Sequence, residues 1–313
     1  MSKVLVSGSL AYDHIMAFPD LFRNHFMPEK LHNINVSFNI REHKEHFGGT
    51  AGNIAYTLAL LGEEPTIVAT AGKDFARYAE HLKVCGIDTA SIHIDDTRDT
   101  SFAYVVTDRG DNQISAFHPG AGGKSYGDRV PFEWANLAII SPGCLEDVHA
   151  LPEIYRTNTI PFFFDPGQII PALSSDDLKN GIEGAEVVFG NDYELSMIAQ
   201  KTGWQEAEIL QHAKTLVVTL GSEGSRVITP NVELRVSAVK AAEALDPTGA
   251  GDAYRAGYAK GFLLGLPPET CAKMASASAV FNVESVGTQE HKFSLDDFKK
   301  RYETAYSEPC PVS

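Results

Sequence analysis

The sequence predicts a doubly wound α/β fold, in which helices flank a mainly parallel sheet that carries a small antiparallel β lid. Short, strongly apolar segments alternate with helical patterns along most of the chain, as in folds whose buried parallel strands are joined by helices. Two stretches show instead the period-two alternation of half-buried antiparallel strands. We expect one domain over residues 1–306, with lid segments inserted at about residues 14–47 and 98–118, and a disordered or loosely docked tail over residues 307–313.

Six apolar segments are the predicted parallel strands. They are residues 4–6, 66–70, 137–140, 160–164, 186–189 and 216–220. Amphipathic helices are expected after Gly52 and after Asn191, and Gly203 should end the second of them. Ligands of a doubly wound sheet bind beyond the carboxyl ends of its strands. The polar turns that follow these segments are therefore the candidate site.

The lid is predicted from two segments that interrupt this alternation. Within residues 31–47, the run 33–40 alternates Asn or Ser with Ile, Val or Phe. Residues 100–117 place two apolar stretches on either side of a polar turn at 108–112, as in a hairpin. A flap with one apolar face would exclude water from an active site. An edge extension or a dimer surface is the alternative, and the two are compatible.

Composition and charge exclude several classes of protein. The chain has 313 residues and a formal net charge of −15, which would repel a nucleic-acid backbone, and no basic cluster offsets that charge. No apolar run approaches the roughly 18 residues that a membrane span needs. The amino-terminal apolar run is short and typical of a first strand, so we expect a cytoplasmic protein. The four cysteines include no Cys-x-x-Cys pair, which argues against a zinc site or a disulfide framework.

The most informative motif is residues 246–252, which read Asp-Pro-Thr-Gly-Ala-Gly-Asp. Gly249 and Gly251 can bring the backbone close to a ligand, and the helix expected to begin there directs unpaired N–H groups toward it. Such a helix start binds anions. Asp252, in the first helical turn, would then be placed to take the proton of an attacking hydroxyl. The alternative is an ordinary loop whose Asp stabilises the helix start.

Another glycine-rich turn, residues 48–55, leads into a helix and reads Gly-Gly-Thr-Ala-Gly-Asn-Ile-Ala. In chain order it is the first glycine motif, and residues 246–257, about 200 residues later, are the second. Together with residues 246–257, it resembles the paired signatures of the ribokinase-like carbohydrate and nucleoside kinases, the phosphofructokinase B type. The order and spacing of the motifs and the position of the lid fit this family over nearly the whole chain. Residues 8–13, 31–38 and 287–289 look most similar to bacterial adenosine kinases.

This resemblance implies an acceptor site. In the family a carboxylate after the first strand accepts hydrogen bonds from two ribose hydroxyls, and here that carboxylate is Asp13. The implied acceptor site comprises Ser9, Ala11, Asp13, Gly48, Gly49 and Asn53. From residue type alone, Asp13 also fits a turn and Asn53 a helix start. Phe38, Phe102 and Phe117 of the lid could surround a base or pack within the lid itself.

The resemblance also implies a nucleotide site. Its catalytic group is Asp252 with the N–H groups of Gly249, Ala250 and Gly251, and its nucleotide contacts are Asn191, Thr219, Gly221, Gly224, Thr248 and Asn282. Glu194 would help to hold Mg²⁺ through water, although Asn191 and Glu194 also fit a helix capping box. A monovalent cation such as K⁺ is expected near Asp246 and Gly287. The Thr219–Gly224 turn also fits a plain strand-to-hairpin connection.

Two residues of the second motif need separate comment. Pro247 departs from the family, which commonly has Thr at this position, and proline removes a backbone N–H. We expect Arg255, one turn after Asp252, to form a solvent-side or structural ion pair. The alternatives are that Arg255 lowers the pKa of Asp252 or touches a phosphate.

The resemblance therefore implies an ATP-dependent kinase that transfers the γ-phosphoryl group to the 5′-hydroxyl of adenosine, giving AMP. Its partners would be the small-molecule acceptor and ATP, with neither nucleic acid nor a membrane, and the chain would act as a monomer or a homodimer. Two alternatives are a kinase of a free sugar such as ribose or fructose and a catalytically silent nucleoside-binding protein. A sugar phosphate is disfavoured, because the sugar-side motifs lack a Lys or Arg pair to hold a second phosphate.

Overall fold

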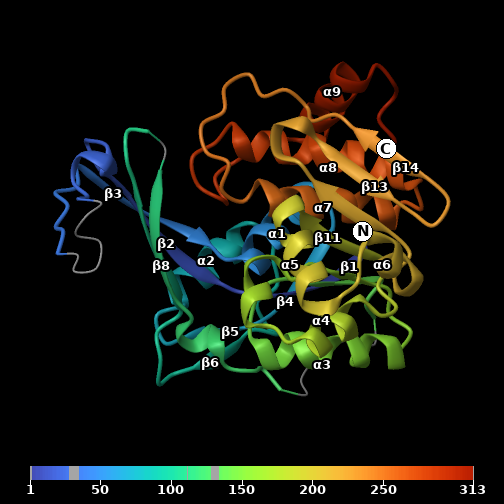
Figure 1. The fold of residues 1–313 in the computed structure, drawn as a ribbon, viewed down its shortest axis with the longest axis horizontal. Helices are drawn as coiled ribbons and strands as arrows, with labels where there is room; N and C mark the ends of the chain where they lie inside the picture. The colour runs from blue at the N-terminus through green and yellow to red at the C-terminus, as the bar shows by residue number, and fades with distance from the viewer. Residues whose placement is uncertain (1, 28–34, 111, 128–133, 313) are drawn as a thin grey trace.

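The core of the molecule is an eight-stranded sheet with the order β14-β13-β12-β11-β10-β9-β1-β4 (Figure 1). The structure is a computed structural model that describes residues 2–27, 35–110, 112–127 and 134–312. The strands are β1 Lys3–Ser7, β4 Glu64–Val68, β9 Leu137–Ile140, β10 Phe162–Phe164, β11 Val187–Asn191, β12 Leu216–Thr219, β13 Ser225–Ile228 and β14 Glu233–Val236. The first six of these are mutually parallel, and β13 and β14 add an antiparallel edge.

All six segments predicted to be parallel strands form parallel strands of this sheet. The second ends earlier than expected, at Val68. Thr70 instead begins β5 (Thr70–Gly72), which pairs with β6 (His93–Asp95) in a separate two-stranded sheet. The apolar pattern predicts that residues 66–70 are buried, but it does not show to which sheet each residue belongs, because β4 and β5 are both buried.

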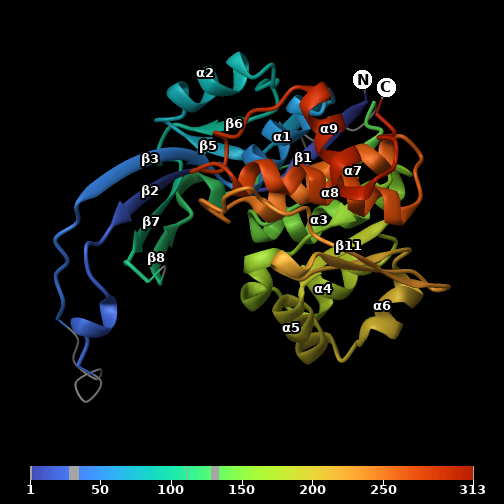
Figure 2. The same cartoon turned by 90° about the horizontal axis from the view of Figure 1, so that it is seen from above.

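Helices cover both faces of the large sheet (Figures 1 and 2). One layer contains α1 Thr50–Leu60, α2 Ala76–Val84, α7 Ala250–Leu263, α8 Pro268–Val283 and α9 Leu295–Tyr306. The other contains α3 Leu145–Thr157, α4 Ser175–Ile182, α5 Asp192–Thr202 and α6 Glu206–His212. Alternate residues of β1 enter the two layers, since Val4 and Val6 pack in the first core and Leu5 in the second. This doubly wound arrangement is the predicted one. Within the described ranges, no helix is both long and apolar enough to cross a bilayer.

The lid is a four-stranded sheet with the order β3-β2-β7-β8, and it projects from one side of the body (Figure 2). Its strands are β2 Ala11–Ala17, β3 Glu42–Gly48, β7 Ser101–Thr107 and β8 Gln113–His118. The β7–β8 hairpin is antiparallel, as predicted. The β2–β3 pairing is also antiparallel, while β2 and β7 run parallel. Asp13 therefore lies within a lid strand and not in a turn.

The strand expected within residues 31–47 begins only at Glu42. Residues 31–34 lie outside the described residues, and residues 35–40 have no regular structure. Phe38 packs instead against Phe18 and Phe22, with ring centroids 4.8 and 5.2 Å apart. Contacts within this aromatic cluster, together with the weak strand preference of Asn, outweigh the alternating pattern.

The carboxyl-terminal residues pack against the body, contrary to the expected loose tail. Glu308 accepts a hydrogen bond from Tyr302 Oη at 2.5 Å and pairs with Lys273 at 3.0 Å. Val312 is buried in the core. The polar composition of this segment does not predict these contacts, because their partners are side chains of α8 and α9.

A buried ion pair fastens α7 to the turn between α1 and β4. Lys260 Nζ contacts Glu63 Oε1, and Lys260 and Glu63 are only 8% and 7% exposed. Glu63 Oε2 also accepts a hydrogen bond from the Ser2 amide at 2.6 Å. Because α7 carries the second glycine motif, this pair helps to fix that helix on the fold.

Replacing Lys260 by Met should destabilise the protein by about 3–5 kcal/mol, because Glu63 would remain buried without its partner. Chemical denaturation followed by circular dichroism measures the loss. The matched double variant Glu63→Met/Lys260→Met should recover most of it, since apolar replacement of both partners is often nearly neutral. A loss below about 1 kcal/mol in the single variant would show that the pair contributes little.

Candidate functional site

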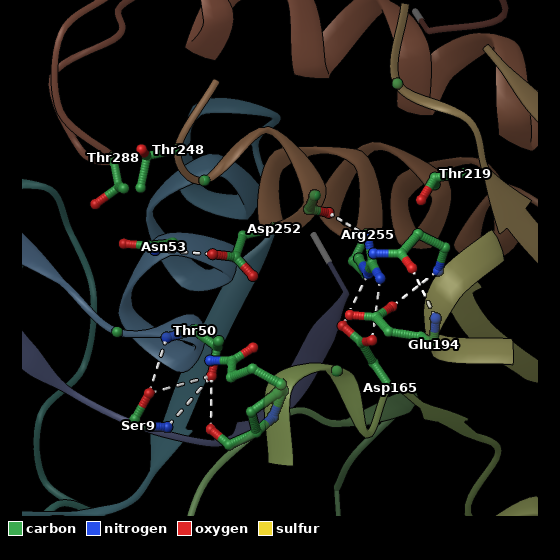
Figure 3. Close-up of a pocket in the computed structure, with 18 of the residues that line it drawn as sticks. Ser9, Thr50, Asn53, Asp165, Glu194, Thr219, Thr248, Asp252, Arg255 and Thr288 are labelled. Carbon is green, nitrogen blue, oxygen red and sulfur yellow. Dashed lines mark hydrogen bonds and ion pairs between the residues drawn. The ribbon is translucent and has the colours of Figure 1, made fainter. Parts of the chain in front are cut away.

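A cavity of about 740 Å³ opens beyond the carboxyl ends of the central strands, where the two glycine-rich turns meet (Figure 3). Ala103 of β7 and Phe117 of β8 line it from the lid. The predicted site residues that line it are Ser9, Ala11, Asp13, Gly49, Asn53, Asn191, Glu194, Thr219, Gly221, Thr248, Gly249, Gly251 and Asp252. The fold thus brings together motifs that lie about 200 residues apart in the sequence.

The start of α7 forms one wall of this cavity. Gly249 precedes the helix with φ of +81°, in the left-handed region that favours glycine. The N–H groups of Gly249 and Gly251 have no acceptor among the described residues. The Ala250 N–H, in contrast, donates to the Pro247 carbonyl oxygen at 3.1 Å. Two of the three amides expected to bind an anion are therefore unpaired, and the third is used by the turn itself.

Asp252 is half-buried at the base of the cavity and is oriented by a side-chain amide. Asn53 Nδ2 donates to Asp252 Oδ2 at 2.8 Å, and Gln289 Nε2 donates to Asn53 Oδ1 at 3.0 Å. Burial raises the pKa of Asp252 to about 7, while the Asn53 hydrogen bond and the charge of Arg255 oppose the rise. A carboxyl group that titrates near neutral pH can accept a proton from a hydroxyl and release it again.

Asp13 approaches the cavity from β2 and packs closely against the first glycine motif. Burial, followed by repulsion from Asp246, raises the pKa of Asp13 to about 6. A Cβ atom on Gly48 would lie 2.0 Å from Asp13 Oδ2, and one on Gly49 would lie 2.5 Å from the Ser9 carbonyl oxygen. Gly49 also has φ of +89°. These two glycines therefore permit the close approach of backbone and carboxylate.

The sequence left two interpretations of Glu194 open, a capping-box residue and a water-mediated Mg²⁺ contact, and its position is compatible with both. Its N–H donates to Asn191 Oδ1 at 2.8 Å, and its Oε2 accepts from the Asn191 N–H at 2.8 Å, which is a capping box at the start of α5. The half-buried carboxylate also lines the cavity, where burial raises its pKa. Because Mg²⁺ keeps several waters and needs few protein ligands beside phosphates, this carboxylate fits a water-mediated magnesium contact. Among the described residues, no group of three or more His, Cys, Asp or Glu forms a metal cluster.

A second cavity of about 640 Å³ adjoins the first. The two share Thr219, Gly221 and Gly251 as lining residues. Small or apolar residues predominate in its wall, among them Gly224, Ala238, Val239, Ala250, Ala279, Val280 and Val283. Such a wall suits a flat heterocycle.

Four residues predicted to contact the acceptor or the nucleotide line neither cavity: Gly48, which packs against Asp13, and Asn282, Phe38 and Phe102. Asn282 is fully buried, and its Nδ2 atom donates to the Thr288 carbonyl oxygen at 3.5 Å. Phe38 belongs to the aromatic cluster of the lid, and Phe102 packs against Tyr104 and His118. Of the three aromatic residues expected around a base, only Phe117 lines the cavity.

Arg255 forms a buried ion pair at the cavity wall. Its Nε and Nη2 atoms donate to Asp165 at 2.8 and 3.0 Å, and its Nη1 atom donates to the Gly251 carbonyl oxygen at 3.1 Å (Figure 3). The structural ion pair is thus present but is not on the solvent side, since Arg255 and Asp165 are 6% and 4% exposed. Asp165 directly follows the predicted strand 160–164, whereas its partner lies 90 residues away in the sequence.

The model of the pfkB family of carbohydrate kinases matches residues 1–293. The chain belongs to this family. The nucleoside kinase of Methanocaldococcus jannaschii is 30% identical over 307 residues, with 97% of each chain covered. That of Methanothermobacter thermautotrophicus is 31% identical over 322 residues, with 99% of this chain and 98% of the relative covered.

The structure of the Burkholderia thailandensis nucleoside kinase in complex with inosine has the same fold, with a TM-score of 0.87 and 33% identity, and the match covers 98% of this chain and 99% of that one. The same protein is also known in complex with ADP-inosine. As a pfkB family kinase, this chain is a phosphotransferase that acts on a hydroxyl acceptor.

The least apparent parts of this pfkB-type site are the polar groups that orient it. Tyr78 Oη donates to the Gly48 carbonyl oxygen at 2.7 Å and accepts from Gln289 Nε2 at 2.5 Å. Thr50 Oγ1 donates to the Pro142 carbonyl oxygen at 2.8 Å. Their spacing in the sequence carries no signal of these contacts. Thr50 and Gln289 stand in segments that carried the family resemblance, whereas Tyr78 does not.

Replacing Gly48 by Ala should raise the KM for the acceptor at least about tenfold, because the new methyl group displaces Asp13 and one charge-assisted hydrogen bond is worth about 1.5–3 kcal/mol. Steady-state kinetics with ATP held at saturation measures the change. Gly190→Ala is the matched control, since its Cβ would lie no closer than 3.5 Å to any neighbour. An unchanged acceptor KM in Gly48→Ala would contradict the role of Asp13.

Proposed function

We propose that this chain transfers the γ-phosphoryl group of ATP to the 5′-hydroxyl of a nucleoside, with adenosine as the first candidate and Asp252 as the general base. One observation carries the proposal: a half-buried carboxylate, oriented by Asn53, lies in the helix turn that also contains the unpaired Gly249 and Gly251 amides. A base beside an anion-binding turn is the arrangement that phosphoryl transfer requires.

In this mechanism Asp252 takes the proton of the acceptor hydroxyl while the hydroxyl oxygen attacks the γ-phosphorus. The bond between the γ-phosphorus and the bridging oxygen of the β-phosphate breaks, and ADP leaves. The Gly249 and Gly251 amides donate to the oxygens on which negative charge accumulates, and each such donor is worth about 2.7–4 kcal/mol. Asp13 holds the sugar by accepting hydrogen bonds from its hydroxyls. Glu194 would hold Mg²⁺ through water, and the ion would supply positive charge beside the phosphates.

The charge of the cavity wall favours a neutral acceptor. Among its described lining residues the only Lys or Arg is Arg255, and that side chain is paired with Asp165. The acceptor end, around Asp13, therefore lacks a cation for a phosphorylated sugar. Ala11, Ala103 and Phe117 add an apolar surround that a nucleoside base would use and a free sugar would not. The inosine complex of the Burkholderia protein supports a purine nucleoside as the acceptor.

The adjoining cavity supports ATP as the phosphoryl donor. Its small and apolar lining residues suit an adenine ring, and the shared residues Thr219, Gly221 and Gly251 lead from it to the anion-binding turn. A monovalent cation such as K⁺ stays a prediction. Asp246 accepts hydrogen bonds from the Thr248 and Gly287 amides at 2.9 and 3.1 Å, and so joins the two loops between which the cation is expected.

Replacing Asp252 by Asn should lower kcat at least about a hundredfold while leaving ATP binding nearly unchanged, because the amide keeps the shape of the side chain but cannot accept the proton. Rapid-quench measurement of phosphoryl transfer tests the first part, and fluorescent-nucleotide titration tests the second. Near-normal turnover in this variant would rule out Asp252 as the base.

A panel of acceptors tests the substrate class most directly. With Mg·ATP in excess, adenosine and inosine should yield ADP at a kcat/KM at least about tenfold above ribose and fructose, because the base adds apolar contact that a free sugar lacks. Coupled detection of ADP measures each rate. Turnover with ribose and none with adenosine would reverse the assignment of the acceptor while leaving the kinase activity intact.

A further inference from the structure

The ion pair between Arg255 and Asp165 joins two elements that meet at the reaction centre. Asp165 directly follows β10, and Arg255 lies one turn after Asp252 on α7. The guanidinium group makes two bonds to Asp165 and one to the Gly251 carbonyl oxygen, and it lies over the Phe189 ring at 5.2 Å. A guanidinium group held on three sides in this way has little freedom to move.

We propose that Arg255 and Asp165 form a positioning pair, which holds the first turn of α7 against the end of β10 and sets how readily Asp252 accepts a proton. The inference rests on the proposed role of Asp252 as the base. It goes beyond that role because neither partner needs to touch a substrate.

The surroundings of Asp252 explain why the pair matters. Four neighbouring groups act on Asp252 from different elements: Asn53 of α1 by a hydrogen bond, Arg255 of α7 by its positive charge, and Asp165 after β10 and Asp13 of β2 by their negative charges. Arg255 favours the ionised form of Asp252, whereas Asp165 opposes it. Because the two charges of the pair act in opposite directions, removing either one leaves the other uncompensated.

The packing of Gly251 supports a positioning role. A Cβ atom at this position would lie 2.9 Å from Arg255 Nη1, so the absence of a side chain lets the guanidinium group approach the turn. The same residue carries one of the two unpaired amides of the anion-binding turn. Arg255 thus contacts the peptide segment that precedes Asp252, and its bonds to Asp165 hold the Gly251 amide and Asp252 in place relative to β10.

The test compares the pH dependence of kcat/KM in Arg255→Gln and Asp165→Asn. In the wild-type protein activity should fall as the pH drops through about 7, because protonated Asp252 cannot accept the hydroxyl proton. Arg255→Gln should move this acidic limb upward by about one pH unit, and Asp165→Asn should move it downward by a similar amount. Ionisation of the substrates is common to every variant, so a difference between variants reports the enzyme.

One further variant and a stability measurement make the outcome decisive. Arg255→Lys keeps the positive charge but loses the bidentate geometry, so its acidic limb should stay near that of the wild-type protein while kcat falls. Thermal denaturation of each variant measures the loss of stability separately, and such a loss lowers activity without moving the limb. Shifts of opposite sign in Arg255→Gln and Asp165→Asn support the proposal, whereas unmoved limbs or shifts of the same sign overturn it. If Asp252→Asn retains turnover, Asp252 is not the base and the proposed function fails. If Asp252→Asn is inactive but the acidic limbs of the pH profiles do not move, only the positioning role of the Arg255–Asp165 pair fails.

Discussion

The structure depends on the burial of several carboxylates around one cavity. Asp13, Asp165, Glu194 and Asp252 all line it, and burial raises the pKa of three of them. Like charges in a partly desolvated site repel, so each needs a specific donor or cation. Asn53 donates a hydrogen bond to Asp252, the Asn191 backbone amide donates one to Glu194, and Arg255 forms an ion pair with Asp165. These partners hold three of the four carboxylates in place, and the pKa of Asp252 stays at about 7.

The same partners connect the lid to the reaction centre. A chain of hydrogen bonds runs from the Gly48 carbonyl oxygen at the end of β3, through Tyr78 and Gln289, to Asn53 and then to Asp252. The strand that holds Asp13 pairs with β3 along its whole length. Asp252 and the β3 edge of the lid therefore belong to one polar network, built from elements that are distant in the sequence, and Asp13 lies on the strand beside that edge.

The parallel strands and the helix ends of this protein could be predicted from local sequence. The six parallel strands, the glycine that ends α5 and the glycine-rich start of α7 follow from apolar runs and backbone conformation, which neighbouring residues determine. Errors came where distant contacts decide the outcome, as with the missing strand before Glu42, the docked carboxyl terminus and the buried Asn282. The Arg255–Asp165 pair spans 90 residues, and its residue types alone fit a surface pair equally well.

The most direct test of the account is a crystal structure of the chain with adenosine, ADP, Mg²⁺ and aluminium fluoride, which mimics the phosphoryl group in transfer. The account predicts that Asp252 lies about 3 Å from the 5′-oxygen and that the Gly249 and Gly251 amides donate to the fluoride group. A complex in which Asp252 faces away from the acceptor, or in which another carboxylate contacts the 5′-oxygen, would contradict it.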